Sequence, residues 1–384
     1  MQSINEEARQ RRAKGLDGAA TTLAAVEGGA ATVEGAAQTA ATEADQPVFR
    51  DGCFRQKRKK GKWRLVVPPV LPADARIADT HAHLDLLADP SLALAQCALW
   101  GVDFVVAMAD AYENPGATFD NLEAWQDAAT ALLPEVLAAT AVCLAEEQGD
   151  APAAAVDAAA FAATFPRSPV PHLRIALGCH PHNAKDYSDA LESDLVARLH
   201  DPRVCAIGEV GLDYHYDFSP RPVQREVFCR QIRLAHQTGL PLILHLREAH
   251  DEAMALMRQE GFPEAGTLLH CFNLDAAALA PWVDAGCSIA IGGPVTFKKS
   301  EDLRRAVALI PPKKLLSETD SPYMTPEPMR GGECGPAHTL FTAAALADVR
   351  GCACAAQRSA FFATLHQNAL DLLDRKPTPW QQNI

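Results

Sequence analysis

The sequence lacks several features that would point to particular classes of protein. It has no unbroken run of about 18 apolar residues, so we expect no membrane-spanning helix. Its first residues contain no apolar segment of the kind a secretory signal needs. The eleven cysteines include no Cys-x-x-Cys pair, and their odd number favours reduced thiols over a disulfide framework. We therefore expect a cytoplasmic protein with no membrane partner.

Basic charge is also in short supply. The 384 residues include 35 Lys and Arg against 48 Asp and Glu, a formal net charge of −13. This balance argues against a general nucleic-acid coat, because binding along many phosphates depends on Lys and Arg. Hydrophobic residues make up 48% of the chain, enough for a large buried core, which excludes a wholly disordered protein.

The chain begins with two segments of unusual composition. Residues 1–48 are of low complexity, rich in Ala, Thr, Gly and Glu, and we expect them to be disordered because they cannot bury enough apolar surface. Residues 49–73 form a basic linker segment, in which Arg55–Arg64 holds seven cations and no acid. This cluster is either a handle for nucleic acid or another polyanion, or a solvated linker that a hairpin at Gly61 would close.

From residue 74 to 374, short apolar runs rich in β-branched residues alternate with helical stretches. Strands that alternate with helices predict a parallel sheet, and eight such units predict an α/β fold of the (β/α)₈ TIM-barrel type. Residues 375–384 would form a C-terminal tail. The eight expected strands are Arg76–Thr80, Phe104–Ala109, Leu173–Gly178, Val204–Gly208, Pro241–His245, Thr267–His270, Ser288–Ile291 and Lys314–Glu318.

One connection is longer than a barrel requires. Residues 111–172, after the second strand, are rich in Ala and hold nine acids against one Arg. Apolar residues recur there at near-helical spacing, beginning with Trp125 and Leu132. We interpret this stretch as a helical insertion, an extra hairpin of helices packed on the barrel, with a separate binding module as the alternative.

The informative polar residues fall at the carboxyl ends of the expected strands. In such a barrel these ends converge on one mouth, where the active sites of such enzymes lie. Several of these residues follow apolar runs that would bury them, and a buried imidazole or carboxylate needs a partner, which metal coordination provides. Two histidines at i and i+2 of a strand also point to the same side. The expected ligands are His81, His83, Glu209, His245, His270 and Asp320.

These motifs resemble those of the TatD-type metal-dependent hydrolases, a branch of the amidohydrolase-like barrel enzymes. Six of them occur in the family's order and span about residues 76 to 325. The segments near Gly335–His338 and Gln367–Leu370 resemble the family's C-terminal pieces. The six are Asp79–Asp85, Gly178–His182, Gly208–Tyr214, His245–Ala249, His270–Phe272 and Glu318–Tyr323.

The resemblance implies two divalent cations. His81 and His83 would hold one of them together with Asp320. Glu209 would bridge to a second, which His245 and His270 would also hold. Two such cations can hold a phosphodiester, activate a water and stabilise the leaving oxygen. A histidine-rich shell suits Zn²⁺ or Mn²⁺, whereas members of the family are often described as Mg²⁺-dependent nucleases, so the metal stays open.

Other residues receive roles around these metals. Asp320 and Glu209 are the expected catalytic residues; Asp320 would take the proton from the attacking water as well as bind metal. Arg247 is expected to clamp a phosphate, because a guanidinium suits bidentate oxyanion binding. His180 and His182 would contact a phosphate or the leaving group, with simple packing beside the site as the alternative.

Three functions are compatible with these residues. The resemblance implies a deoxyribonuclease, an exonuclease acting on DNA ends or single strands. A metal pair also polarises a carbonyl, so hydrolysis of an aminoacyl-tRNA or a small-molecule ester is a second hypothesis. A third hypothesis is a non-catalytic scaffold. The presence of all six expected metal ligands argues against it.

Overall fold

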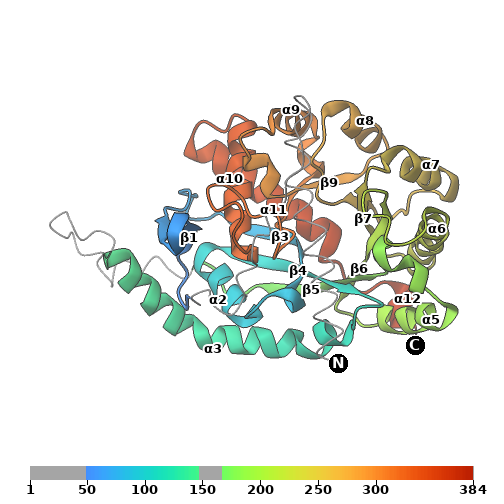
Figure 1. The fold of residues 1–384 in the computed structure, drawn as a ribbon, viewed down its shortest axis with the longest axis horizontal. Helices are drawn as coiled ribbons and strands as arrows, with labels where there is room; N and C mark the ends of the chain where they lie inside the picture. Colours follow the sequence, from blue (N-terminus) through green and yellow to red (C-terminus); the bar gives the residue numbers. More distant parts are fainter. Residues whose placement is uncertain (1–48, 147–166, 384) are drawn as a thin grey trace, which may run out of the picture.

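The structure is a computed structural model that describes residues 49–146 and 167–383 (Figure 1). The expectation of disorder for residues 1–48 lies outside the described residues. So does the return helix that the expected insertion would need between residues 147 and 166.

Eight parallel strands form one sheet, in which each strand pairs with the next along the chain. An isolated parallel bridge between Ala82 and Ser321 brings its first and last strands together. All eight predicted strands are present within a few residues of their expected bounds, and the predicted (β/α)₈ barrel is confirmed. The strands are β3 (Ile77–Ala82), β4 (Val102–Asp110), β5 (His172–Gly178), β6 (Val204–Asp213), β7 (Leu242–Arg247), β8 (Thr267–Leu269), β9 (Ser288–Ile291) and β10 (Leu315–Ser317).

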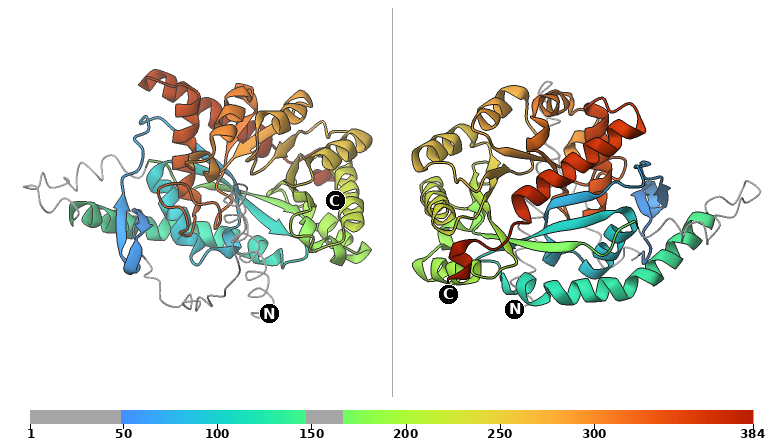
Figure 2. Two further views of the ribbon diagram at one scale, coloured as in Figure 1. Left: turned by 45° about the horizontal axis from the view of Figure 1, so that its top comes forward. Right: turned by 180° about the vertical axis from the view of Figure 1, so that it is seen from behind.

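Helices surround the sheet on its outer side (Figures 1 and 2). Local sequence sets their ends: Asp89 accepts the Leu92 amide to begin α2, and Gly101, with φ of 84°, ends it. The helices are α2 (Pro90–Trp100), α3 (Gly116–Glu146), α5 (Asp189–Leu199), α6 (Arg221–Thr238), α7 (His250–Glu260), α8 (Ala276–Asp284), α9 (Glu301–Leu309), α10 (Thr339–Val349), α11 (Ala355–Leu373) and α12 (Pro379–Gln382). Short 3₁₀ helices cover Lys59–Gly61, Leu84–Leu86, Pro181–Asp186, Gly293–Thr296, Pro312–Lys314 and Pro336–His338.

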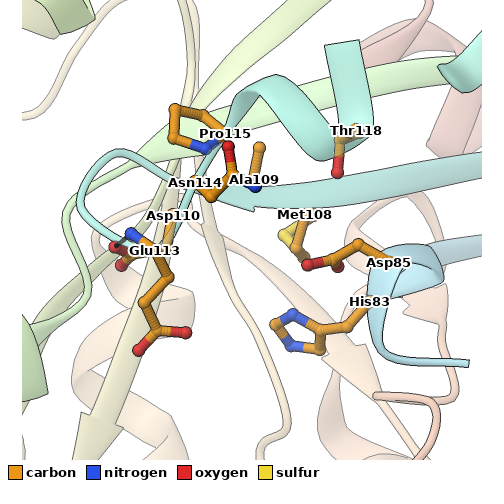
Figure 3. Close-up of a pocket in the computed structure, with 9 residues that line it drawn as sticks. All are labelled: His83, Asp85, Met108, Ala109, Asp110, Glu113, Asn114, Pro115 and Thr118. Carbon is orange, nitrogen blue, oxygen red and sulfur yellow. Dashed lines mark hydrogen bonds between the residues drawn. The ribbon is translucent and has the colours of Figure 1, made fainter. Parts of the chain in front are cut away.

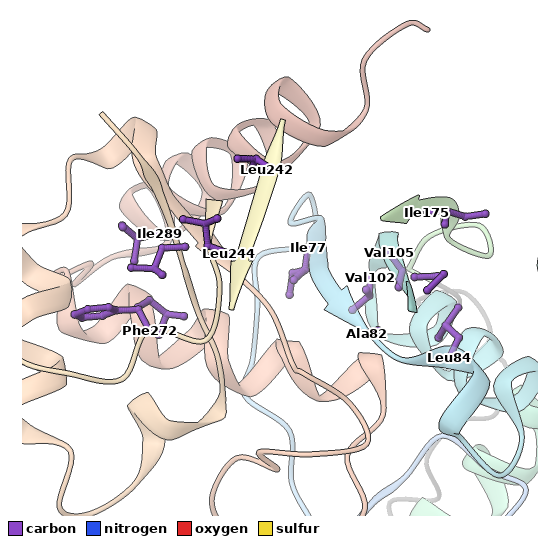
Figure 4. Close-up of a cluster of buried hydrophobic side chains, with 14 of the residues drawn as sticks. Ile77, Ala82, Leu84, Val102, Val105, Ile175, Leu242, Leu244, Phe272 and Ile289 are labelled. Atoms are coloured by element: carbon purple, nitrogen blue, oxygen red, sulfur yellow. The ribbon is translucent and has the colours of Figure 1, made fainter. Parts of the chain in front are cut away.

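Two apolar clusters fill the protein. One lies between the strands and the outer helices and includes Ile77, Val105 and Leu244 (Figure 4). The second gathers side chains from the strands, such as Phe104 and Ile243, with residues of α11 that include Leu373. Alternate strand residues therefore face opposite ways, and both faces of the sheet are buried.

The long connection after β4 contains one 31-residue helix, α3, along one side of the barrel (Figure 1). Phe119, Leu122, Ala129 and Val136 recur at intervals of three or seven residues and are buried, so one face of α3 packs onto the protein while much of the rest is exposed. The stretch Gly116–Leu144 is long and apolar enough, by length and composition, to cross a membrane. A single helix of this kind does not by itself indicate a membrane protein.

The basic segment before the barrel folds as an antiparallel hairpin of β1 (Phe54–Lys57) and β2 (Trp63–Val66), with Gly61 in its turn. Phe54 is only 5% exposed, and its ring packs against those of Trp100, His338 and Phe341. This aromatic contact attaches the hairpin to the barrel beside α10 (Figure 1).

Candidate metal centre

Two histidines at the end of β3 face two carboxylates that arrive from other strands. His81 Nε2 lies 3.5 Å from Glu209 Oε2 and 3.7 Å from Asp320 Oδ1. His83 Nε2 lies 3.7 Å and 3.5 Å from the same two oxygens. Glu209 belongs to β6, and Asp320 follows β10. These four side chains, distant in the sequence, thus surround one small space.

The other oxygen of Glu209 faces a second set of histidines. Glu209 Oε1 lies 2.6 Å from His245 Nδ1, 3.2 Å from His270 Nε2 and 3.5 Å from His180 Nε2. Each carboxylate oxygen therefore has its own group of imidazoles. A carboxylate placed in this way can bridge two cations, one on each oxygen.

All six predicted ligands lie in this cluster, and His180 lies with them. His180, for which we expected a substrate contact, groups with Glu209 and His245. His270 groups with His81 and Asp320, although it also lies near Glu209. Within this cluster, the ligand atoms of three sets lie within 4.8 Å of one another: His81, His83 and Glu209; His81, His270 and Asp320; and His180, Glu209 and His245.

Burial makes a cation a good fit for this cluster. His81 has no exposed surface, and neither of its ring nitrogens finds a hydrogen-bond partner among the described residues. An unpaired polar atom in the interior is costly, and a nitrogen lone pair is also what a divalent metal takes from histidine. The residues present therefore fit divalent cations.

The cluster combines groups whose pKa is lowered with groups whose pKa is raised. Burial opposes the charge of Glu209, but the neighbouring His180 and His81 outweigh it and hold the pKa of the carboxyl well below its usual range. Burial lowers the pKa of His81 and of His180, and neighbouring imidazoles lower both further. Neighbouring carboxylates instead raise the pKa of His245 and of His270 despite burial, so these two imidazoles would release a proton when a cation binds.

A buried carboxylate, Asp213, supports the second set of histidines. Its Oδ2 lies 2.8 Å from His182 Nε2 and 3.3 Å from His245 Nε2. These bonds hold the pKa of Asp213 below its usual range even though burial opposes its charge. Hydrogen bonds of this kind fix the orientation and tautomer of a ligating histidine. His182 therefore contacts Asp213, whereas His180 faces Glu209 directly.

The sequence interpretation gave no role to Glu318, which supports the cluster from the other side. Glu318 Oε1 lies 3.5 Å from His270 Nδ1 and accepts the Cys271 amide at 2.5 Å. Its position at the end of β10, two residues before Asp320, could have drawn attention to it. The sequence did not show that the chain after β8 brings His270 and Cys271 to this carboxylate, so these contacts could not be predicted.

The remaining predicted residue, Arg247, lies at the edge of the cluster. Its guanidinium carbon is 4.6 Å from the centre of the Tyr216 ring, and no acid pairs with it among the residues that the structure describes. A small pocket opens beside His83 on another part of the mouth (Figure 3). It is lined by three acids, Asp85, Asp110 and Glu113. The mouth is therefore acidic at the His83 pocket and has a cation beside Tyr216.

A barrel with a histidine and carboxylate cluster at the carboxyl ends of its strands is typical of metal-dependent hydrolases. Comparison with known proteins agrees. The family model "TatD related DNase" matches residues 78–372, so the chain belongs to the TatD family and is a metal-dependent hydrolase.

Several relatives are known from sequence. The chain is 37% identical over 175 residues to YabD of Bacillus subtilis, an uncharacterized metal-dependent hydrolase, a match that covers 46% of this chain and 69% of YabD. It is 41% identical to the uncharacterized metal-dependent hydrolase TatD of Mycobacterium tuberculosis, over 45% of this chain and 67% of the relative. A match of 36% covers 41% of this chain and 60% of the 3′-5′ ssDNA/RNA exonuclease TatD of Salmonella typhimurium.

Solved structures show the same fold. The TatD homologue YjjV of Escherichia coli superposes with a TM-score of 0.58 at 24% identity, covering 79% of this chain and 99% of YjjV. A TatD family hydrolase of Entamoeba histolytica gives a TM-score of 0.60 at 15% identity, with the same coverage of both chains. At these levels of sequence identity, the two structures show only that the chain shares their fold.

Proposed function

We propose that this protein hydrolyses phosphodiester bonds at the ends of single-stranded DNA with the help of two divalent cations. The observation that carries the proposal is the position of Glu209, whose two carboxylate oxygens face separate histidine groups. The name of the Salmonella relative, a 3′-5′ ssDNA/RNA exonuclease, and that of a human relative, the 3′-5′ RNA nuclease TATDN2, support a nucleic-acid substrate.

The proposed ligands divide according to the oxygen of Glu209 that they face. His81 and His83 would share one cation with Asp320 and Glu209 Oε2. His180 and His245 would share the other with Glu209 Oε1, and His270 lies between the two positions. When bound, such cations supply positive charge for the phosphoryl oxygens and lower the pKa of a water.

The side chains of the protein would do the remaining work. Burial raises the pKa of Asp320 to about 6 in the absence of cations, and a bound cation would lower it again. From its position beside His81 and His83, Asp320 would take the proton of the attacking water. Arg247, which has no acidic partner among the described residues, would hold a phosphate oxygen through two N–H groups.

The proposal can be tested with protein stripped of metal and reloaded with Mg²⁺, Mn²⁺ or Zn²⁺. The substrates are a labelled single-stranded 20-mer, the matching duplex, an RNA of the same sequence and an aminoacyl-tRNA. We expect stepwise release of nucleotides from the single strand in at least one metal. Hydrolysis of the aminoacyl ester without any release of nucleotides would instead favour an esterase.

A matched pair of variants separates this chemistry from contaminating nuclease. Glu209→Gln removes the bridging charge, whereas Glu226→Gln makes the same change at an exposed position of α6. Only the first variant should lose activity. Equal activity in both would show that the cleavage does not come from this site.

A further inference from the structure

The loop after β6 carries a pair of stacked aromatic rings at the mouth of the barrel. The Tyr216 and Phe218 rings lie 5.3 Å apart between centroids and only 12° from parallel. Phe218 is 39% exposed. Among the described residues, the other exposed aromatic side chain is Tyr112, which also follows the carboxyl end of a strand. The exposed Phe218 ring at the mouth of the barrel is therefore open to contact by a substrate.

Hydrogen bonds hold this loop in place. Asp213 Oδ1 accepts the backbone amides of His215 and Tyr216, each at 3.0 Å. The Gln224 side-chain amide donates to the carbonyls of Asp213 and Ser219. The two rings are thus fixed by the same carboxylate that contacts His245, so their position relative to the centre is set before any substrate binds.

A single side chain, His182, lies between the aromatic pair and the proposed ligand His245. The His182 ring packs edge-on against Phe218, with centroids 4.8 Å apart, and against Tyr216, with centroids 5.5 Å apart. The His182 ring lies 6.1 Å from that of His245. The guanidinium of Arg247 lies over the Tyr216 ring. An aromatic face, a cation and the metal centre therefore occur side by side.

We infer that Tyr216 and Phe218 form a stacking platform for an unpaired nucleobase next to the phosphate held at the centre. The inference rests on the proposed function and names how its substrate is gripped. An unpaired base offers a free π-face, whereas neighbouring base pairs cover those faces inside a duplex. Stacking also suits a chain with a net charge of −13, because it does not depend on a long track of cations.

The test compares two oligonucleotides with the same backbone. One is an ordinary single-stranded 10-mer, and the other lacks the bases of the three nucleotides at each end. Phe218→Ala should lower kcat/KM for the ordinary strand by roughly 10-fold, the scale of one lost base stack. It should leave the abasic strand unchanged. Phe218→Trp, which restores a ring, should recover activity, and Leu309→Ala, at an exposed apolar position of α9, should change neither substrate.

A binding measurement keeps the platform testable apart from cleavage. Fluorescence anisotropy of the two labelled strands in EDTA should show tighter binding of the ordinary strand to the wild type and no such preference in Phe218→Ala. Preference for bases without cleavage in any metal would sink the proposed function and leave the platform standing. Equal losses on ordinary and abasic strands, or binding that ignores the bases, would overturn the platform.

Discussion

The imidazole of His81 stacks on that of His270, with ring centroids 3.8 Å apart and planes 15° from parallel. Burial lowers the pKa of His81, and His270 lowers it further, because two protonated rings would repel each other at this distance. Burial opposes the charge of His270, but Glu318 and Glu209 together outweigh it and raise the pKa of this imidazole. The pair thus favours a neutral His81, the form in which a histidine binds metal.

Removal of charge from the central carboxylates should abolish turnover. We expect Glu209→Gln and Asp320→Asn each to lower kcat by at least about 100-fold, since both lose a metal ligand and Asp320→Asn also loses the base. Elemental analysis should find fewer metal equivalents in Glu209→Gln, because both histidine groups face that side chain. Thermal unfolding close to that of the wild type would confirm folding, and near-normal kcat in either folded variant would contradict the assigned roles.

His180 and His182 should differ in their effect on metal binding. The Nε2 atom of His180 faces Glu209, whereas that of His182 faces Asp213. We therefore expect His180→Ala to weaken binding of one metal strongly, and His182→Ala to weaken it less, by about 10- to 100-fold, as for loss of an outer contact. Titration against a fluorescent chelator measures both constants. Unchanged metal affinity in His180→Ala would return this residue to the role of a substrate contact.

The stability of the protein should fall in mild acid because of His338. Burial lowers the pKa of this histidine to about 4, against about 6.5 for an unfolded chain. Between these two pH values the unfolded state binds a proton at His338 and the folded state does not. The stability that the neutral His338 contributes is therefore fully present above pH 6.5 and is lost as the pH falls toward 4. From pH 7 to pH 5 the loss should be about 2 kcal/mol.

Urea unfolding at the two pH values measures this loss. The comparison is with His338→Asn, whose side-chain oxygen can replace the ring nitrogen that accepts the Gly335 amide. The variant should be less sensitive to pH by about the same amount. An identical pH dependence in both proteins would assign the effect to other groups.

The hairpin of β1 and β2 should be separable from catalysis. Phe54→Ala should weaken the packing of the hairpin on the barrel by about 3 kcal/mol, because a buried aromatic ring is lost. Trypsin should then cut faster within the cations of Arg55–Arg64. Val67→Ala, at an exposed position beside the hairpin, should change neither property.

Catalysis itself should survive these changes. No residue of the hairpin lies in the metal cluster within the described part of the chain, so hydrolysis of a small chromogenic phosphodiester should continue in Phe54→Ala. Deletion of residues 1–73 should have the same outcome. Loss of hydrolysis in a folded deletion variant would show that the extension completes the site.

The sequence was sufficient to locate the strands and the centre because both depend on local pattern. Apolar runs of four to eight residues marked the strands, and the barrel then required their carboxyl ends to meet. His81, Glu209 and Asp320 could be brought together on that basis alone.

What could not be predicted depends on contacts between distant loops. The grouping of His180 with His245 follows from the orientation of two side chains at the mouth, which strand positions do not determine. The docking of Phe54 onto Phe341 joins segments almost 290 positions apart, and no periodicity within the basic segment indicates it. The length of α3 was also missed, because its apolar residues are spread over a largely exposed helix.

Because the first and last strands of the barrel meet, the metal centre can form only late in the synthesis of the chain. The Asp320 amide donates to the His81 carbonyl, and the His83 amide donates to that of Ser321. The centre therefore lies on the line where the two ends of the barrel join. A ribosome must synthesise nearly the whole barrel before His81 meets Asp320, so an unfinished chain would carry its histidines without a complete metal centre.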